Sequence, residues 1–339
     1  MTNRVLAAVL TVWCLIGGIG LFSGAAEQQG PTPLASVGAV RLPHVKGRID
    51  HLTYDPARRR LFVAALGNDS VEVIDAASNT LVRSLTGFHE PQGMAFVPDL
   101  AAVAVANGTS GTLQLIDAQS LAIRWTIPIG GDADNVRYDT ATKRLFVAAE
   151  GGLFIVDAAG KPVGRIAFDG HPESFQLESR SGRVYANLPG LIRSEVVVAD
   201  RGSTKVVGRW ATPGCGSNYP MTLDESTGRL FIGCRRPASL TMLDTGSGSG
   251  VTSLPVVGDT DDIFYDESRR RVYVIGGDGF IDVIARDGDR LTRRGRVDTR
   301  PGTRTGLWVG ALSRLYAAVP ARGSEPAEVR AFEARDPSP

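Results

Sequence analysis

Residues 60–85 read RLFVAALGNDSVEVIDAASNTLVRSL, and the opening motif of this stretch recurs along the chain. It returns as RLFV, RVYA, RLFI, RVYV and RLYA, starting at Arg144, Arg183, Arg229, Arg271 and Arg314. The spacings are 84, 39, 46, 42 and 43 residues, and the first equals two units of 42. A period of about 40–45 residues with several strands per unit is typical of a β-propeller.

Each repeat unit predicts four antiparallel strands. In the first unit, residues 51–55, 60–66, 70–76 and 81–87 alternate or are apolar, and turn-forming residues separate them. The pattern also fits residues 135–168, 174–211, 221–256 and 263–297. A degenerate AVAV at residues 102–105 represents the copy that the long spacing skips.

The last unit, residues 307–334, lacks a fourth strand, and residues 34–42 (LASVGAVRL) form a strand that no unit uses. Pairing the two closes the ring and removes its exposed edges. We therefore predict an all-β fold: a seven-bladed β-propeller of four-stranded antiparallel blades, its ring closed by the N-terminal strand. The propeller spans residues 34–334, and residues 335–339 form a C-terminal tail.

The order RLFVA, Gly/Asn turn, SVEVID and NTLVRSL resembles the YVTN-repeat β-propeller family. The resemblance covers essentially the whole chain after the N-terminal segment, and no Trp-Asp dipeptide of the WD-repeat kind is present. The resemblance implies an exported or surface protein. Most members of this family have undefined activity, and some are reported as binding modules. A shared fold leaves the function open.

The N-terminal segment predicts export. Arg4 precedes an apolar run at residues 5–22 and small residues at 23–26, the order of a secretory signal peptide. We predict a signal peptide at residues 1–26 and a periplasmic or extracellular protein. The apolar run is also long enough for an uncleaved membrane anchor, the one route by which we expect membrane contact.

Composition and motifs narrow the function classes. The chain has 37 basic and 36 acidic residues without a charge block, which argues against a nucleic-acid partner. It lacks the G-x-S-x-G, P-loop, H-E-x-x-H and C-x-x-C-H motifs, so no enzyme class is indicated. We expect a monomer that binds a small polar molecule or a protein partner.

Cys215 and Cys234 are the cysteines that remain after export. In an oxidising compartment such a pair favours a disulfide, and the spacing matches no zinc pattern. With a hairpin turn between Asp224 and Arg229, Cys234 is expected opposite Tyr219. The preceding loop can then fold back and bring Cys215 to Cys234.

Candidate binding residues come from the loops that share one face of the predicted ring. These loops enter the first strand of each blade or join its second and third strands, where rigid blades hold free side chains. The predicted ligand-binding residues are Asp50, His51, Asp134, Asn135, His171, Glu173, Tyr219, Arg235, Asp261, Asp262 and Arg304.

The acidic and histidine residues of this set allow several interpretations. Asp, Asn and Ser side chains can simply cap turns, and histidines can satisfy loop polarity. Alternatively, converging carboxylates require a positive group, and a divalent cation such as calcium suits oxygen ligands. The metal-ligand candidates are His51, Asp134, Glu173 and Asp261. His51 and His171 are also acid/base candidates, whereas His44 and His89 lie further from the channel.

Arginines on the same face are Arg193, Arg235, Arg236, Arg300, Arg304 and Arg322. They form either a solvated rim or an anion site, and the split of acids and arginines suits a zwitterionic or sugar-acid ligand. The main functional hypothesis is a binding module for a small polar ligand or a protein partner. The alternatives are a lactonase-like hydrolase that uses channel-side His and carboxylate groups, with or without a metal, and a purely structural docking module.

Overall fold

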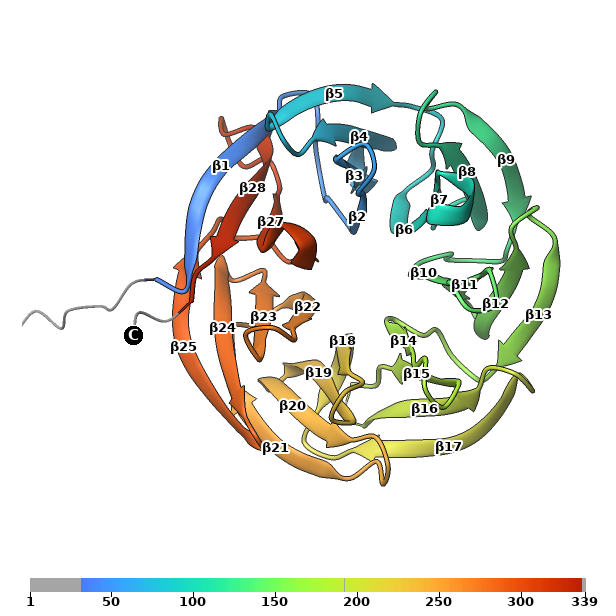
Figure 1. The fold of residues 1–339 in the computed structure, drawn as a ribbon, viewed down its shortest axis with the longest axis vertical. Helices are drawn as coiled ribbons and strands as arrows, with labels where there is room; N and C mark the ends of the chain where they lie inside the picture. Colours follow the sequence, from blue (N-terminus) through green and yellow to red (C-terminus); the bar gives the residue numbers. More distant parts are fainter. Residues whose placement is uncertain (1–31, 192, 337–339) are drawn as a thin grey trace, which may run out of the picture. The chain divides into compact units, whose positions relative to one another are not determined.

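The computed structural model describes residues 32–191 and 193–336, which form one compact unit. Within this unit, seven four-stranded antiparallel sheets are arranged as the blades of a ring (Figure 1). The predicted seven-bladed propeller is therefore confirmed. The predicted signal peptide or anchor lies outside the described residues, as does the end of the predicted tail, residues 337–339.

Each blade runs from an inner strand at the channel to an outer strand at the rim. Blade 1 contains β2 (Leu52–Asp55), β3 (Arg60–Ala65), β4 (Ser70–Asp75) and β5 (Thr80–Leu85). Blade 2 contains β6 (Pro91–Val97), β7 (Ala102–Asn107), β8 (Thr112–Asp117) and β9 (Ile123–Pro128). Blade 3 contains β10 (Val136–Asp139), β11 (Arg144–Ala149), β12 (Gly152–Asp157) and β13 (Pro162–Ala167). Blade 4 contains β14 (Phe175–Leu177), β15 (Arg183–Leu188), β16 (Ser194–Asp200) and β17 (Lys205–Thr212).

Blade 5 contains β18 (Gly216–Asp224), β19 (Arg229–Arg236), β20 (Ala238–Asp244) and β21 (Gly250–Pro255). Blade 6 contains β22 (Thr260–Asp266), β23 (Arg271–Gly276), β24 (Phe280–Asp287) and β25 (Arg290–Asp298). Blade 7 contains β26 (Gly306–Val309), β27 (Arg314–Val319), β28 (Ala327–Ala334) and β1 (Leu34–Leu42). Short 3₁₀ turns occupy η1 (Leu66–Asn68), η2 (Pro98–Leu100) and η3 (Gly310–Leu312).

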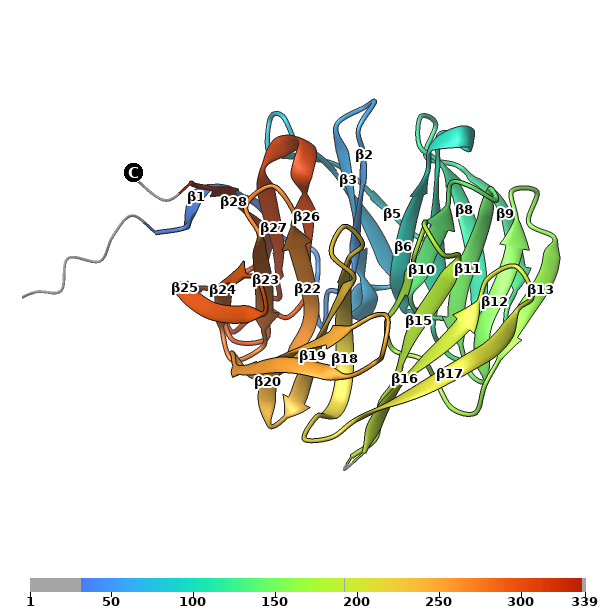
Figure 2. The same cartoon turned by 60° about the horizontal axis from the view of Figure 1, so that its bottom comes forward.

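The N-terminal strand closes the ring, as the sequence predicted. β1 pairs antiparallel with β28, from Leu34 opposite Ala334 to Leu42 opposite Ala327 (Figures 1 and 2). Blade 7 therefore combines both ends of the propeller. Because β1 pairs with β28, β28 is not left as an open edge.

The hydrophobic core lies between neighbouring blades. Phe62 and Val71 of blade 1, for example, are fully buried against Val103 and Ile116 of blade 2. The second strand of each blade supplies the apolar run of the repeat, so β3 is buried along almost its whole length, whereas the rim strand β5 is largely exposed. Burial between blades explains why one repeat alone cannot form a core.

The arginine that opens the repeat motif joins neighbouring blades. Arg60 of blade 1 donates a hydrogen bond to the carbonyl of Ala118 in blade 2, at 3.0 Å. Arg183 of blade 4 reaches the carbonyl of Thr245 in blade 5 in the same way, also at 3.0 Å. The repeated Arg-Leu-Phe signal thus combines a buried strand with a link to the next blade.

The predicted disulfide is present, with 5.2 Å between the Cα atoms of Cys215 and Cys234. The predicted register was wrong by one residue, because Cys234 pairs with Asn218 and not with Tyr219. A β-bulge between Asn218 and Met221 inserts an extra residue into β18 and causes the shift.

Among the residues that the structure describes, we find no helix with the length and apolar character needed to cross a membrane.

Candidate functional site

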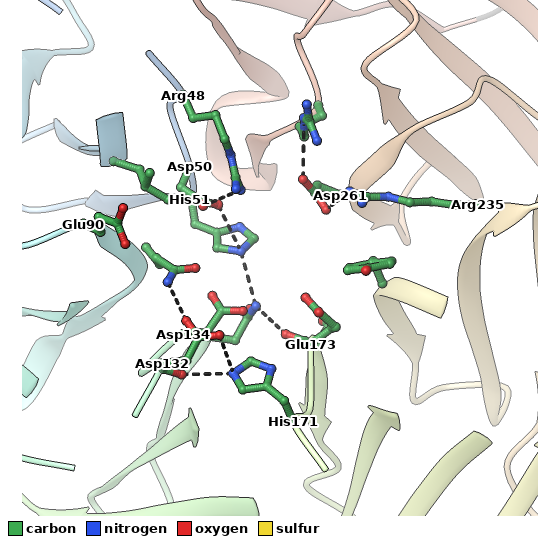
Figure 3. Close-up of a pocket in the computed structure, with 16 residues that line it drawn as sticks. Arg48, Asp50, His51, Glu90, Asp132, Asp134, His171, Glu173, Arg235 and Asp261 are labelled. Atoms are coloured by element: carbon green, nitrogen blue, oxygen red, sulfur yellow. Dashed lines mark hydrogen bonds and ion pairs between the residues drawn. The ribbon is translucent and has the colours of Figure 1, made fainter. Parts of the chain in front are cut away.

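A polar cavity of about 380 Å³ lies where the loops entering the inner strands converge. Its lining includes ten of the eleven predicted binding residues: Asp50, His51, Asp134, Asn135, His171, Glu173, Tyr219, Arg235, Asp261 and Arg304 (Figure 3). The eleventh, Asp262, does not line this cavity but hydrogen-bonds to His51. The structure therefore brings the whole predicted set together.

Sequence reasoning missed six further lining residues: Arg48, Leu66, Glu90, Gln92, Asp132 and Ser174. Arg48 and Asp132 lie two positions before the predicted residues Asp50 and Asp134, and Ser174 directly follows Glu173. A wider window around each predicted residue would have found these three.

His51 is held as a cation between carboxylates. Its Nδ1 lies 3.2 Å from the Oδ2 of Asp262, and its Nε2 lies 3.6 Å from the Oδ1 of Asp50. Burial alone would lower the pKa of His51, but the charges of Asp262 and Asp50 outweigh burial and raise it to about 10. His51 is thus an imidazolium at neutral pH, a state in which it cannot bind a metal.

Two carboxylates that line the polar cavity, those of Asp134 and Glu173, have no hydrogen-bond or ion-pair partner among the described residues. Burial raises the pKa of Asp134 well above its usual range, and the charge on His51 opposes this rise. Burial also raises the pKa of Glu173 to about 7, against the smaller opposing effect of His171.

Asn135 contacts the same groups from the floor of the cavity. Its Nδ2 donates to the carbonyl of Glu173 at 2.6 Å and lies 3.3 Å from the Nε2 of His51. Its Oδ1 is buried and has no hydrogen-bond partner among the described residues. A buried acceptor without a donor is rare in folded proteins.

On the opposite wall, the carboxylates are neutralised by arginine. Arg235 forms an ion pair with Asp261, and its guanidinium lies over the ring of Tyr219, 3.9 Å from the centroid. Arg304 lies 3.3 Å from the Oδ2 of Asp259 and 3.8 Å from the Oδ2 of Asp261. Burial still raises the pKa of Asp261 to about 6, against the effect of Arg235.

Two further pairs border the cavity. Arg48 contacts Asp50, with 3.1 Å between Nη2 and Oδ2. His171 lies with its Nε2 3.0 Å from the carbonyl oxygen of Asp132, whose carboxylate accepts a hydrogen bond from Gln92 at 3.0 Å. The contacts of Asp132 with Gln92 and His171 connect blades 2, 3 and 4 beside Asp134 and Glu173, whereas the Arg48–Asp50 contact lies within one loop of blade 1 (Figure 3).

Not every residue considered on this face reaches the cavity. Arg300 is buried and donates to the carbonyls of Pro320 and Pro326, so its role is structural. Arg193 lines a separate cavity beside Leu188. The remaining side chains considered, His44, His89, Arg236 and Arg322, do not line the polar cavity either.

Several aspartates outside the cavity cap turns. Asp75, Asp117 and Asp244 each accept two backbone N–H groups from the turn that follows the third strand of their blade. Asp134 and Asp261 accept no such local bond within the described part of the chain. Their convergence on the cavity is therefore not a by-product of turn formation.

No metal-ligand arrangement is evident: over residues 32–191 and 193–336, no three His, Cys, Asp or Glu side chains group in a way that could hold a metal ion.

Comparison with known proteins supports the fold alone. No protein-family model matches the chain, so the predicted resemblance to the YVTN-repeat family is not confirmed. No curated protein matches it by sequence. Among solved structures, one described as Kuenenia stuttgartiensis hydrazine synthase aligns with a TM-score of 0.74 and 18% identity, covering 83% of this chain and 98% of that one.

A second structure, described as a mitotic checkpoint complex, also aligns with a TM-score of 0.74. The identity is 14%, and the alignment covers 99% of this chain and 100% of that one. The two descriptions concern very different processes. The likeness therefore establishes a β-propeller, and the function must be argued from the cavity.

Proposed function

We propose that this protein is a binding module for a small polar molecule that carries an amine or a similar cationic group, held in the polar cavity. The observation that carries the proposal is the pair of unpartnered carboxylates, Asp134 and Glu173. A carboxylate that burial forces toward its protonated form gains most when a cation arrives, because the cation restores its charge and its hydrogen bonds.

The rest of the cavity supports recognition by charge and shape. Arg235, lying over Tyr219, together with Arg304 provides a wall of cationic groups that are already paired with acids. This wall can orient a carboxylate or hydroxyl at the far end of the ligand.

The test uses a pair of probes matched in length. Cadaverine and pentane-1,5-diol differ in their charged ends, and binding to the protein without its N-terminal segment is measured by calorimetry and thermal shift. We expect cadaverine to bind and to raise the melting temperature, and the diol to do neither. Glu173→Gln should weaken cadaverine binding about tenfold or more, since a charge-assisted bond is lost.

The control variant is Glu150→Gln, because Glu150 is exposed and does not line the cavity. It should bind cadaverine as the unaltered protein does. Equal binding of cadaverine and the diol, or an equal effect of both substitutions, would reject the proposal.

A hydrolase similar to the propeller lactonases is the second candidate, and the pKa of Glu173 favours it. A buried carboxyl with a pKa of about 7 is suited to general acid–base work near neutral pH. A screen of sugar lactones tests this hypothesis. Turnover that disappears in Glu173→Gln would support it, and absence of turnover would leave the binding module.

We also propose that the protein is exported. A disulfide such as that between Cys215, in the loop before β18, and Cys234 of β19 is typical of proteins from an oxidising compartment. A protein partner at the same face is the remaining alternative to a small ligand. A pull-down from the exported fraction tests it: a partner that cadaverine displaces would occupy the same cavity.

A further inference from the structure

A second cavity, of about 630 Å³, lies further along the central channel. All seven inner strands contribute to it, and its large side chains include Tyr54, Phe96, Tyr138, Met221, Phe264 and Leu307. Its volume is in the range of small-molecule sites. Unlike the polar cavity, it is walled mainly by aromatic and aliphatic groups.

The two cavities open on opposite faces of the ring. The polar cavity is lined by residues that precede the inner strands, whereas the second cavity includes Pro56, Pro98 and Thr140, which follow them. His51 lines both cavities, and its partner Asp262 lines the second one. The His51–Asp262 pair therefore separates them.

Arg137 is a charged group of this second cavity that makes no ion pair among the described residues; burial lowers its pKa, and the charges of Asp262 and Asp134 oppose this. Its guanidinium donates one hydrogen bond, to the carbonyl of Val136 at 2.9 Å, and lies 5.5 Å from the centroid of Phe175. No carboxylate of the described residues is within ion-pair distance of it. Since a guanidinium carries five N–H donors, most of its bonding capacity is open to a ligand.

The other titratable groups facing the cavity do not cancel this charge. Asp262 is matched by the imidazolium of His51 and also accepts the N–H of Gly306 at 2.9 Å. Tyr54 and Tyr138 stay neutral, because burial raises the pKa of both phenols, that of Tyr138 to about 12. Asp262 is thus engaged by His51 and Gly306, and it makes no ion pair with Arg137.

We propose that this second cavity binds an organic anion with an apolar body, such as a medium-chain or aromatic carboxylate, with its carboxylate on Arg137. The aromatic and aliphatic walls bury the body, and the planar guanidinium matches the two oxygens of a carboxylate. The proposal concerns a different site and a ligand of opposite charge from the function proposed above, so either can fail alone.

The experiment uses octanoate as the probe, with octan-1-ol and octylamine as uncharged and cationic counterparts of the same length. Calorimetry on the protein without its N-terminal segment should show octanoate binding much more tightly than either. Arg137→Gln should weaken octanoate binding about 10- to 100-fold. Arg83→Gln, at an exposed arginine on the rim strand β5, should leave it unchanged.

Two further variants locate the site. Leu307→Trp adds bulk to the cavity wall on β26, whereas Arg137 lies on β10, and it should abolish octanoate binding even if Arg137→Gln fails to fold. Glu173→Gln alters only the polar cavity and should have no effect on octanoate. The inference is overturned if octanol binds as well as octanoate, if Leu307→Trp binds octanoate normally, or if Glu173→Gln abolishes binding.

Discussion

His51 and Asp262 are 211 residues apart in sequence, yet the Nδ1 of the imidazole lies 3.2 Å from the Oδ2 of the carboxylate. The contact joins blade 1 to blade 6, and the N–H of Gly306 in blade 7 bonds to the same oxygen at 2.9 Å. Three blades thus meet at one carboxylate. The cost of desolvating both charges offsets much of their attraction, so a buried pair of this kind adds little net stability, although removing one partner alone is destabilising.

Asp262→Asn should lower the pKa of His51 by about 1–2 units. Asp262 is the strongest of the carboxylates that raise this pKa to about 10, and Asp50 remains to hold it above its ordinary value. A titration of the imidazole followed by NMR measures the shift. Asp99→Asn, at an aspartate outside the cavity, is the control and should leave the pKa unchanged. An unaltered pKa in Asp262→Asn would contradict the assigned pairing.

Glu173 should make the protein more stable in mild acid than at neutral pH. In the folded state its pKa is about 7, raised from an ordinary value of 4.5, so the folded protein binds the proton more tightly than the unfolded chain does. The free energy of unfolding therefore falls as the pH rises through this window, by an amount on the order of 1–3 kcal/mol.

Urea unfolding at a series of pH values tests this prediction. Glu173→Gln should reduce the slope between pH 4.5 and 7 and raise stability at pH 7, because the buried charge is gone. His51 also makes the free energy of unfolding fall as the pH rises, but at higher pH. Its stabilising positive charge is present at pH 6.5 and is lost toward pH 10. If Glu173→Gln has the same pH profile as the unaltered protein, Glu173 ionises normally.

The sequence predicted the fold because the propeller repeats its signal. The Arg-Leu-Phe motif marks the second strand of most blades, and once these strands are in register the loops before the inner strands are equivalent. This equivalence placed Asp134 and Asp261 on one face. It required only the period and the alternation of apolar residues, which a single sequence contains.

The detailed chemistry of the site was not predictable in this way. Whether Arg235 neutralises Asp261 or reaches solvent depends on side-chain direction across two blades, and Arg300, on the same predicted face, turns inward to backbone carbonyls. The bulge at residues 218–221 likewise has no clear signal, and it shifted the predicted partner of Cys234. Side-chain directions and bulges of this kind depend on the local packing of each blade and its neighbours. The period of the repeat does not predict them.

Removing β1 should destroy the cooperative unfolding of the ring. β1 pairs along β28 and contributes Val40 and Leu42 to the core between blades 7 and 1. A chain that starts at residue 43 leaves β28 as an open edge and exposes this core. Compared with a chain that starts at residue 32, we expect a broad transition and aggregation in thermal unfolding. Equal transitions would show that closure by β1 is dispensable.

The disulfide should stabilise both the folded chain and the wall of the polar cavity. Cys215 and Cys234 are separated by 19 residues, and closing a loop of that size restricts the unfolded chain by about 3 kcal/mol. Both sulfurs are buried beside Met221 and Ile232, so the bridge also holds the bulged start of β18 against β19. The double variant Cys215→Ala/Cys234→Ala should therefore lose about 3 kcal/mol of unfolding free energy in urea.

The double variant should also bind cadaverine less tightly, because Tyr219 and Arg235 lie on these two strands. Intact-mass measurement with and without reductant, after alkylation, tests for the bridge in protein purified without reductant. Two free thiols there, or an unchanged urea midpoint in the double variant, would remove the bridge from both the stability and the binding argument.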